Sequence, residues 1–489
     1  MINRRRLLQT TAAGAGMAAI GAPALAQGEP APTPLWAFMD RTFEQALDLS
    51  PETVTSLGLD KGARAAAKSQ LTIPTPETEE RGRAFTLAQQ AELARMDAAG
   101  MSERDRIYYD TLVDNLDATI ATYAIPYGQG GWPNPYRVSQ QGGAYQSAPD
   151  FLANQHTIET AGDADAYVAR IEALADVLTV ETERVREDFA LGVVPPDFIL
   201  AKAIRQQEGM TGTPAAESSM VESVVSRTRD KGLTGDWGAR VERLLTERVY
   251  PALAAQTGVL KAAQPGATHE ASVRRLPQGE QYYANSLRYI TTTRLSADEI
   301  HRTGLEQVAE LSGRADVLLK AQGMTQGSVA ERIAAMGADP KYIYPNTDAG
   351  KAELIGKLNE QMGAMQARLP NAFGRLPKAG AEIKRVPPAV EQGAPMGYYN
   401  GPSLDGSRPG IYWINLKDTA DWPSWTLPTL TYHEASPGHH LQIALQQESP
   451  SAPKLMNLFF FSAYGEGWGL YAEQLAYELG AYQDDPAGQ

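Results

Sequence analysis

Apolar residues recur at intervals of three and four positions through most of this chain, and that spacing restricts the fold more than any other feature. Between residues 163 and 190, Tyr167, Ile171, Leu174 and Leu178 fall on one side of a helix. The same test predicts helices over roughly 35–50, 80–124, 196–209, 237–263, 296–311 and 349–370. The sequence therefore predicts a mainly α fold.

Three short segments between residues 380 and 416 break this helical pattern. They read EIKRV, MGYYN and GIYWINL, are rich in β-branched and aromatic residues, and are separated by proline, glycine and the turn LDGSRPG. A small antiparallel sheet is expected here. Because it directly precedes a histidine-rich segment, the sheet and that segment should be neighbours.

Composition favours one large globular body and excludes several classes of function. Of 489 residues, 43% are hydrophobic and 21% are charged, so residues 35–489 are predicted to form a single, largely helical domain. The chain has no cysteine, which excludes disulfides, thiolate metal sites, cysteine nucleophiles and lipid-modified cysteine. A formal net charge of −14 argues against nucleic acid as a partner.

The first 26 residues have the pattern of an export signal. Arg4, Arg5 and Arg6 precede an apolar stretch that ends with small residues at Ala24 and Ala26, and the paired arginines are typical of a twin-arginine signal. Residues 27–34, QGEPAPTP, are expected to be a linker. We expect a periplasmic or secreted protein that contacts the export machinery transiently and keeps no membrane anchor after cleavage.

The segment YHEASPGHHLQ, residues 432–442, carries three of the six histidines and indicates a metal site. His433 and Glu434 begin an H-E-x-x-H pattern, in which two histidines bind zinc and the glutamate is the general base. The expected second histidine is replaced by Pro437. An ideal helix would return His440 to within about 20° of His433, whereas a bulge would bring His439 to that place. Because proline disfavours an ideal helix, we predict the bulge.

A third ligand is expected on the later helix FFFSAYGEGWGLYAEQLAYELG. Glu466 lies between two glycines that leave space around it, and Glu473 lies seven residues further on nearly the same face. We expect Glu466 to bind the metal and Glu473 to orient a histidine. The metal site, within residues 425–480, is predicted to hold one zinc ion per chain.

These residues predict hydrolysis of a peptide or another small substrate, with Glu434 taking the proton from a zinc-activated water. The candidates for stabilising the oxyanion are Tyr471, Tyr412 and His440, and the residues alone leave all three open. Arg408 could bind a terminal carboxylate, and the strand GIYWINL could pair with an extended substrate. The alternative is a binding or scaffold protein without catalysis.

The motifs HEASPGHHLQ, EGWGLYAE and DGSRPG, with the segment LPQGEQYYANSLRYITTTRLSADEIHRTGL, resemble the bacterial domain of unknown function 885. The resemblance implies a zincin-like helical body of the glutamate-ligand class, with His433, His439 and Glu466 as ligands and Glu434 as base. It favours His439 over His440. It also implies that family members continue beyond this C-terminus, and an inactive, truncated descendant is the alternative function.

Overall fold

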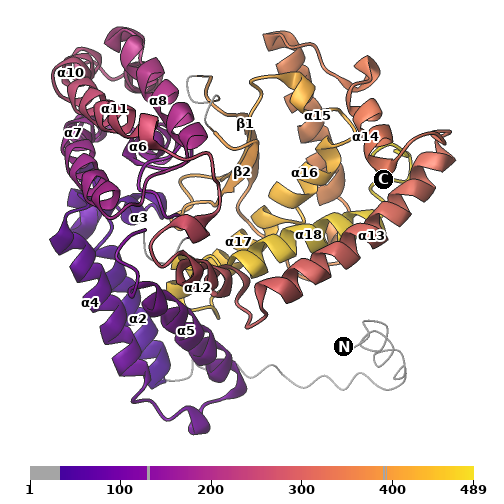
Figure 1. Cartoon of the computed structure of the whole chain (residues 1–489), viewed down its shortest axis with the longest axis horizontal. Helices are drawn as coiled ribbons and strands as arrows, with labels where there is room; N and C mark the ends of the chain where they lie inside the picture. Colours follow the sequence, from indigo (N-terminus) through magenta and orange to yellow (C-terminus); the bar gives the residue numbers. More distant parts are fainter. Residues whose placement is uncertain (1–32, 129–132, 389–390, 392–393) are drawn as a thin grey trace.

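The computed structural model describes residues 33–128, 133–388, 391 and 394–489 (Figure 1). The predicted signal peptide, residues 1–26, and most of the linker lie outside the described residues. In the described part of the chain, no helix is long and apolar enough to cross a bilayer.

Helices dominate the chain, which confirms the predicted mainly α fold. The first part of the chain contains α2 (Pro34–Leu47), α3 (Pro51–Ser56), α4 (Pro76–Leu93), α5 (Glu103–Thr122), α6 (Ala144–Asn154), α7 (Ala161–Ala190), α8 (Asp197–Gly212), α9 (Ser219–Asp230), α10 (Trp237–Leu244), α11 (Tyr250–Ala263) and α12 (Gly279–Thr291). The second part contains α13 (Ala297–Ala321), α14 (Val329–Gly337), α15 (Asp348–Gln366), α16 (Leu427–Glu434), α17 (His439–Glu448) and α18 (Ser462–Glu478).

The long helix α7 forms because it has both a continuous apolar face and a capped N-terminus. Thr160 and Asp163 make a reciprocal capping box at its start. Tyr167, Ile171 and Leu174 are buried, as the spacing predicted, in a core shared with α6 and α8–α11. The predicted helix over 80–124 is instead two helices, α4 and α5, because a new N-cap at Ser102 starts the second one.

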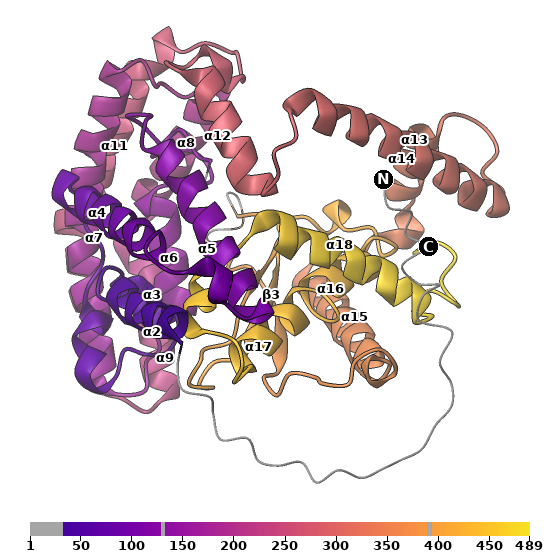
Figure 2. The same ribbon diagram turned by 90° about the horizontal axis from the view of Figure 1, so that it is seen from below.

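The helix α13 begins at the expected capping box of Ser296 and Glu299 but does not bury its apolar residues. Leu305, Val308 and Leu311 are each more than half exposed. Figure 2 shows α13 and α14 extending away from the helices α2–α12. The periodicity therefore predicted the helix correctly, while burial of its apolar face depends on partners that the local pattern does not specify.

The three predicted strands form one sheet, but it is mixed and not antiparallel. The strands are β1 (Ala381–Arg385), β2 (Gly397–Asn400) and β3 (Gly410–Ile414), in the order β1–β3–β2. A turn joins β2 to β3, so these two run antiparallel, whereas β1 occupies the other edge and runs parallel to β3. Both edges of β3 are therefore occupied, and GIYWINL has no free edge to offer a substrate.

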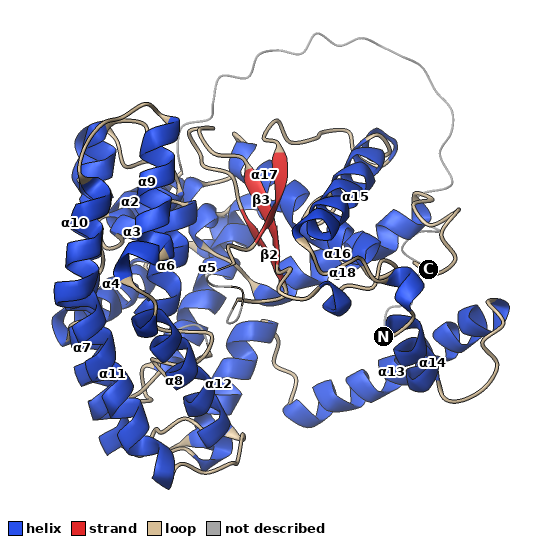
Figure 3. Ribbon diagram, turned by 90° about the horizontal axis from the view of Figure 1, so that it is seen from above, coloured by secondary structure: helices blue, strands red, loops and turns tan. Residues whose placement is uncertain are grey.

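The sheet positions α16, the helix that carries His433 and Glu434. Tyr412 and Ile414 of β3 share a core with Leu354 and Leu358 of α15 and with Leu427 at the start of α16. Figure 3 shows the strands between the N-terminal helices and the pair α15 and α16. The expected proximity of sheet and histidine helix is thus produced by a common apolar core.

A buried histidine ties α7 to the preceding segment. His156 Nε2 lies 2.9 Å from the carbonyl oxygen of Asp163, and its Nδ1 accepts a hydrogen bond of 2.9 Å from Arg170. Burial, helped by the charge of Arg170, lowers the pKa of His156 to about 3. The folded state thus holds this imidazole neutral.

Acidification is expected to destabilise the fold through His156. Its folded pKa lies below the unfolded value, so the unfolded state binds the extra proton, and stability falls as pH drops below 6.5. The free energy of unfolding should decrease by about 3 kcal/mol between pH 6.5 and pH 4 from this side chain. Urea unfolding should show a weaker pH dependence in His156→Asn. The exposed His301→Asn control should behave like the wild type; equal pH dependence in all three proteins would contradict the assignment.

Candidate metal centre

The histidine segment is divided between two helices. α16 ends at Glu434 and α17 begins at His439, so the expected bulge is a complete break at residues 435–438. A Cβ atom at Gly438 would lie 1.8 Å from the carbonyl oxygen of His433. The turn therefore requires glycine, because the backbone passes too close to leave room for a side chain. The break places the side chain of His439, and not that of His440, beside His433.

The helix α18 packs against this break and brings both glutamates to it. The indole of Trp468 donates a hydrogen bond of 2.9 Å to the carbonyl oxygen of Pro437. Glu473 Oε1 lies 2.9 Å from His433 Nδ1, and Glu466 Oε2 lies 3.3 Å from His433 Nε2. The two carboxylates therefore contact opposite nitrogens of one imidazole.

Two imidazoles and one carboxylate converge at this point. Ligand atoms of His433, His439 and Glu466 all lie within 4.8 Å of one another, and His439 Nε2 is 3.8 Å from Glu466 Oε2. A tetrahedral zinc with bonds of about 2.0–2.2 Å holds its donors roughly 3.3–3.6 Å apart. The separations of 3.3 and 3.8 Å from Glu466 to the two histidines fit such an ion with little movement.

Exposure leaves the donor set open on one side. The side chains of His433 and His439 are 19% and 8% exposed, whereas that of Glu466 is 54% exposed. The cluster is thus held in the protein by the histidines and reached by solvent at Glu466. Three protein donors with an open side is the arrangement typical of a catalytic zinc site and not of a closed structural one.

The glycines of α18 have separate roles that the sequence did not reveal. A Cβ atom at Gly469 would lie 2.5 Å from Cε1 and 2.7 Å from Nε2 of His433. A Cβ at Gly465 would lie 2.5 Å from the ring of Phe460, whereas one at Gly467 would have nothing within 4 Å. Of the three, Gly469 is the residue that lets the helix approach the metal-site imidazole.

Gly469→Ala is expected to weaken zinc binding by about tenfold or more, because the added methyl group displaces the His433 ring. Gly467→Ala is a matched control, since it makes the same change in the same helix and gains the same helix propensity without a contact. Competition with a chromophoric chelator measures both affinities. Equal affinities for the two variants would show that Gly469 does not position His433.

Glu434 lies outside the group of possible ligand atoms that His433, His439 and Glu466 form. It follows His433 at the end of α16 and is buried, and no described residue forms a hydrogen bond with its carboxylate. Burial raises the pKa of Glu434 to about 7, with the charge of Glu466 adding to the effect and His433 opposing it. A cation at the cluster would favour the ionised form.

His440 lies outside the group of His433, His439 and Glu466, and both of its ring nitrogens have hydrogen-bond partners. Its Nδ1 is 2.8 Å from the hydroxyl of Tyr399 on β2, and its Nε2 is 3.1 Å from the carbonyl oxygen of Ala379. These partners fix a neutral ring that donates from Nε2 and accepts at Nδ1. Burial lowers the pKa of His440 in the same sense. Its contacts indicate that it joins α17 to the sheet.

The remaining candidate residues are distributed unevenly. Tyr412 is fully buried near Glu434, and its hydroxyl has no hydrogen-bond partner among the described residues. Burial, and after it the charge of Glu434, raises the pKa of Tyr412. Tyr471 is half-exposed and packs on Trp468, on a different face of α18 from Glu466. Arg408 donates to the carbonyl oxygens of Gly401 and Ser56, so it fastens the DGSRPG turn to α3. Tyr412 therefore lies close enough to Glu434 for the charge of that carboxylate to act on it.

Comparison with protein families assigns most of the chain. Residues 51–489 match the family model described as "Bacterial protein of unknown function (DUF885)". The chain belongs to this family. Comparison with curated proteins finds no match.

Two solved structures resemble this DUF885 protein. A "putative lipoprotein" from Colwellia psychrerythraea superposes with a TM-score of 0.87 at 30% identity, covering 93% of this chain and 79% of its own. A "putative lipoprotein of unknown function" from Shewanella oneidensis gives a TM-score of 0.59 at 16% identity, covering 93% and 80%. The first supports the family assignment, and the second shows likeness of fold alone.

Proposed function

We propose that this DUF885 protein is an exported zinc-dependent hydrolase that cuts peptides. The observation that carries the proposal is the convergence of His433, His439 and Glu466 beside the buried carboxylate of Glu434. Two histidines, a glutamate and a neighbouring general base are the set used by zinc peptidases of the glutamate-ligand class.

A zinc ion held by these three residues would supply Lewis acidity and lower the pKa of a water to about 7. Glu434 then accepts the proton of the attacking water and passes it to the leaving amine. Its lack of a hydrogen-bonding partner among the described residues keeps the carboxylate free for this exchange. Glu473 holds the His433 ring through Nδ1, which fixes Nε2 as the metal-facing nitrogen.

Tyr412 is the residue that we propose for stabilising the oxyanion. Its hydroxyl is buried close to Glu434, so it could donate to a negative charge that develops beside that carboxylate. Burial raises the pKa of Tyr412 and keeps the hydroxyl protonated. His440 is less suited because both of its ring nitrogens already have partners.

Export through a twin-arginine-type signal is part of the proposal. The basic start of the sequence supports it, and both structural relatives are described as lipoproteins, which is consistent with the cell envelope. These 489 residues contain no cysteine to which a lipid could be attached. We therefore propose a periplasmic or secreted location for the processed chain.

Zinc analysis combined with digestion of a peptide library tests this function. The purified chain should contain about one zinc ion and should produce cleaved peptides that disappear after chelation and return when zinc is restored. A chain that binds zinc and cleaves no peptide would overturn the proposed reaction and favour a binding or scaffold role. A chain without zinc affinity would overturn the site itself.

A further inference from the structure

A second cavity lies among the N-terminal helices, away from the metal cluster. It has a volume of about 740 Å³ and is bounded by α6, α8, the start of α9 and Tyr250 of α11. No residue of the metal cluster lines it. Its size falls within the roughly 300–1,000 Å³ common for small-ligand sites.

The floor of this cavity is a fixed arrangement of amides. The Tyr145 hydroxyl lies 2.6 Å from the carbonyl oxygen of Ser139 and 2.7 Å from Gln206 Oε1. Gln146 Nε2 donates to Gln140 O and to Gln206 Oε1, at 2.7 and 3.1 Å. The Oε1 atom of Gln140 is buried and has no partner among the described residues.

Beneath this floor is a buried polar network where a helix bundle normally packs apolar residues. Glu181 on α7 accepts from the backbone amide of Ala144 at the start of α6 and from Gln256 on α11. Gln207 on α8 donates to Gln256 Oε1 at 2.7 Å. A satisfied network of this kind specifies one arrangement of its helices, which here fixes the floor rigidly.

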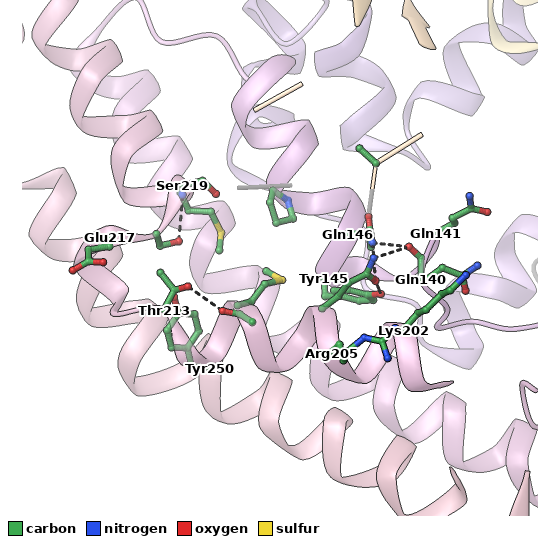
Figure 4. A pocket seen from close by; sticks show the side chains of 17 residues that line it. Gln140, Gln141, Tyr145, Gln146, Lys202, Arg205, Thr213, Glu217, Ser219 and Tyr250 are labelled. Carbon is green, nitrogen blue, oxygen red and sulfur yellow. Dashed lines mark hydrogen bonds between the residues drawn. The ribbon is translucent and has the colours of Figure 1, made fainter. Parts of the chain in front are cut away.

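The charges around the cavity are divided between its two ends. Figure 4 shows Lys202 and Arg205 with the glutamines at one end, and Glu217 with Ser219 at the other. In the described part of the chain, neither Lys202 nor Arg205 has a carboxylate within 4.0 Å, and Glu217 has no cation within that distance. Pro149, Met210 and Met220 supply apolar wall.

We propose that this cavity binds short peptides with free termini, at a site separate from the metal centre. The peptide carboxylate meets Lys202 and Arg205, and its ammonium group meets Glu217. Its backbone amides exchange hydrogen bonds with the glutamines that line the floor. The cavity thus takes the same class of compound that the proposed hydrolase would release, although its recognition does not depend on zinc.

The test uses Ala-Ala-Ala as probe, titrated calorimetrically into the full chain carrying Glu434→Gln, so that the probe is not cut. We expect saturable binding, weakened about tenfold or more by the double change Lys202→Gln and Arg205→Gln. Amidation of the peptide C-terminus should weaken binding to the parent similarly and have little further effect on the double variant. Likewise, N-acetylation of the peptide should weaken binding to the parent and have little further effect on binding to the Glu217→Gln variant.

The changed side chains are exposed, so the variants should fold as the parent does, which thermal unfolding checks. Arg186→Gln, an exposed change on the outer surface of α7, is the matched control and should leave the affinity unaltered. Absence of saturable binding up to millimolar peptide would overturn the proposal. Binding that the Lys202, Arg205 and Glu217 changes leave intact would also overturn it, since the probe would then occupy another site. Neither result bears on zinc binding or peptide cleavage.

Discussion

Replacing His439 by alanine is expected to reduce the zinc affinity of the chain by about a thousandfold, because it deletes one of three metal bonds. The same change at His440 should alter zinc affinity little. The reason is geometric: His439 Nε2 lies 3.8 Å from Glu466, whereas both nitrogens of His440 bond to Tyr399 and Ala379.

The two histidines are adjacent and both are buried, so the pair is well matched for this comparison. His440→Ala removes the Tyr399 contact and should lower thermal stability while zinc binding persists. Zinc affinities measured by competition at equal folded fraction separate the two effects. Equal loss in both variants, or loss in His440→Ala alone, would contradict the arrangement of the break between α16 and α17.

Glu434→Gln is expected to lower peptide hydrolysis by about 10²- to 10⁴-fold without loss of zinc, because the amide cannot accept the proton. Glu466→Gln is the matched comparison: it makes the same chemical change at a proposed ligand and should lose zinc together with activity. Activity on the library peptides and metal content are measured on the same preparations. Loss of metal from Glu434→Gln, with retention in Glu466→Gln, would mean that the two glutamates have been assigned in reverse.

The sequence predicted the parts of this fold that depend on local rules. Spacing and capping located α7 and the start of α13, and Pro437 predicted that the histidine helix could not be regular. Parallel pairing of β1 with β3 could not be predicted, because the path of the chain between strands is set by packing of distant segments. The exposure of the apolar residues of α13 could not be predicted either, because burial depends on how the whole molecule packs.

The candidate site shows a similar division. The residue types and spacing indicated His433, Glu434, Glu466 and Glu473 without a structure. Two contacts could not be predicted: the approach of Gly469 to the His433 ring and the hydrogen bond from Trp468 to Pro437. Both depend on how α18 packs against the break between α16 and α17. The two glycines of the segment EGWG indicated close packing around this helix. The sequence could not show that Gly469, and not Gly467, approaches His433.

The most direct test of the metal centre is diffraction at the zinc absorption edge from crystals of the wild-type chain grown with zinc. We expect one strong anomalous peak about 2.0–2.2 Å from the Nε2 atoms of His433 and His439 and from a carboxylate oxygen of Glu466. A peak coordinated by His440 in place of His439, or no peak in this cluster at full zinc saturation, would contradict the proposed site.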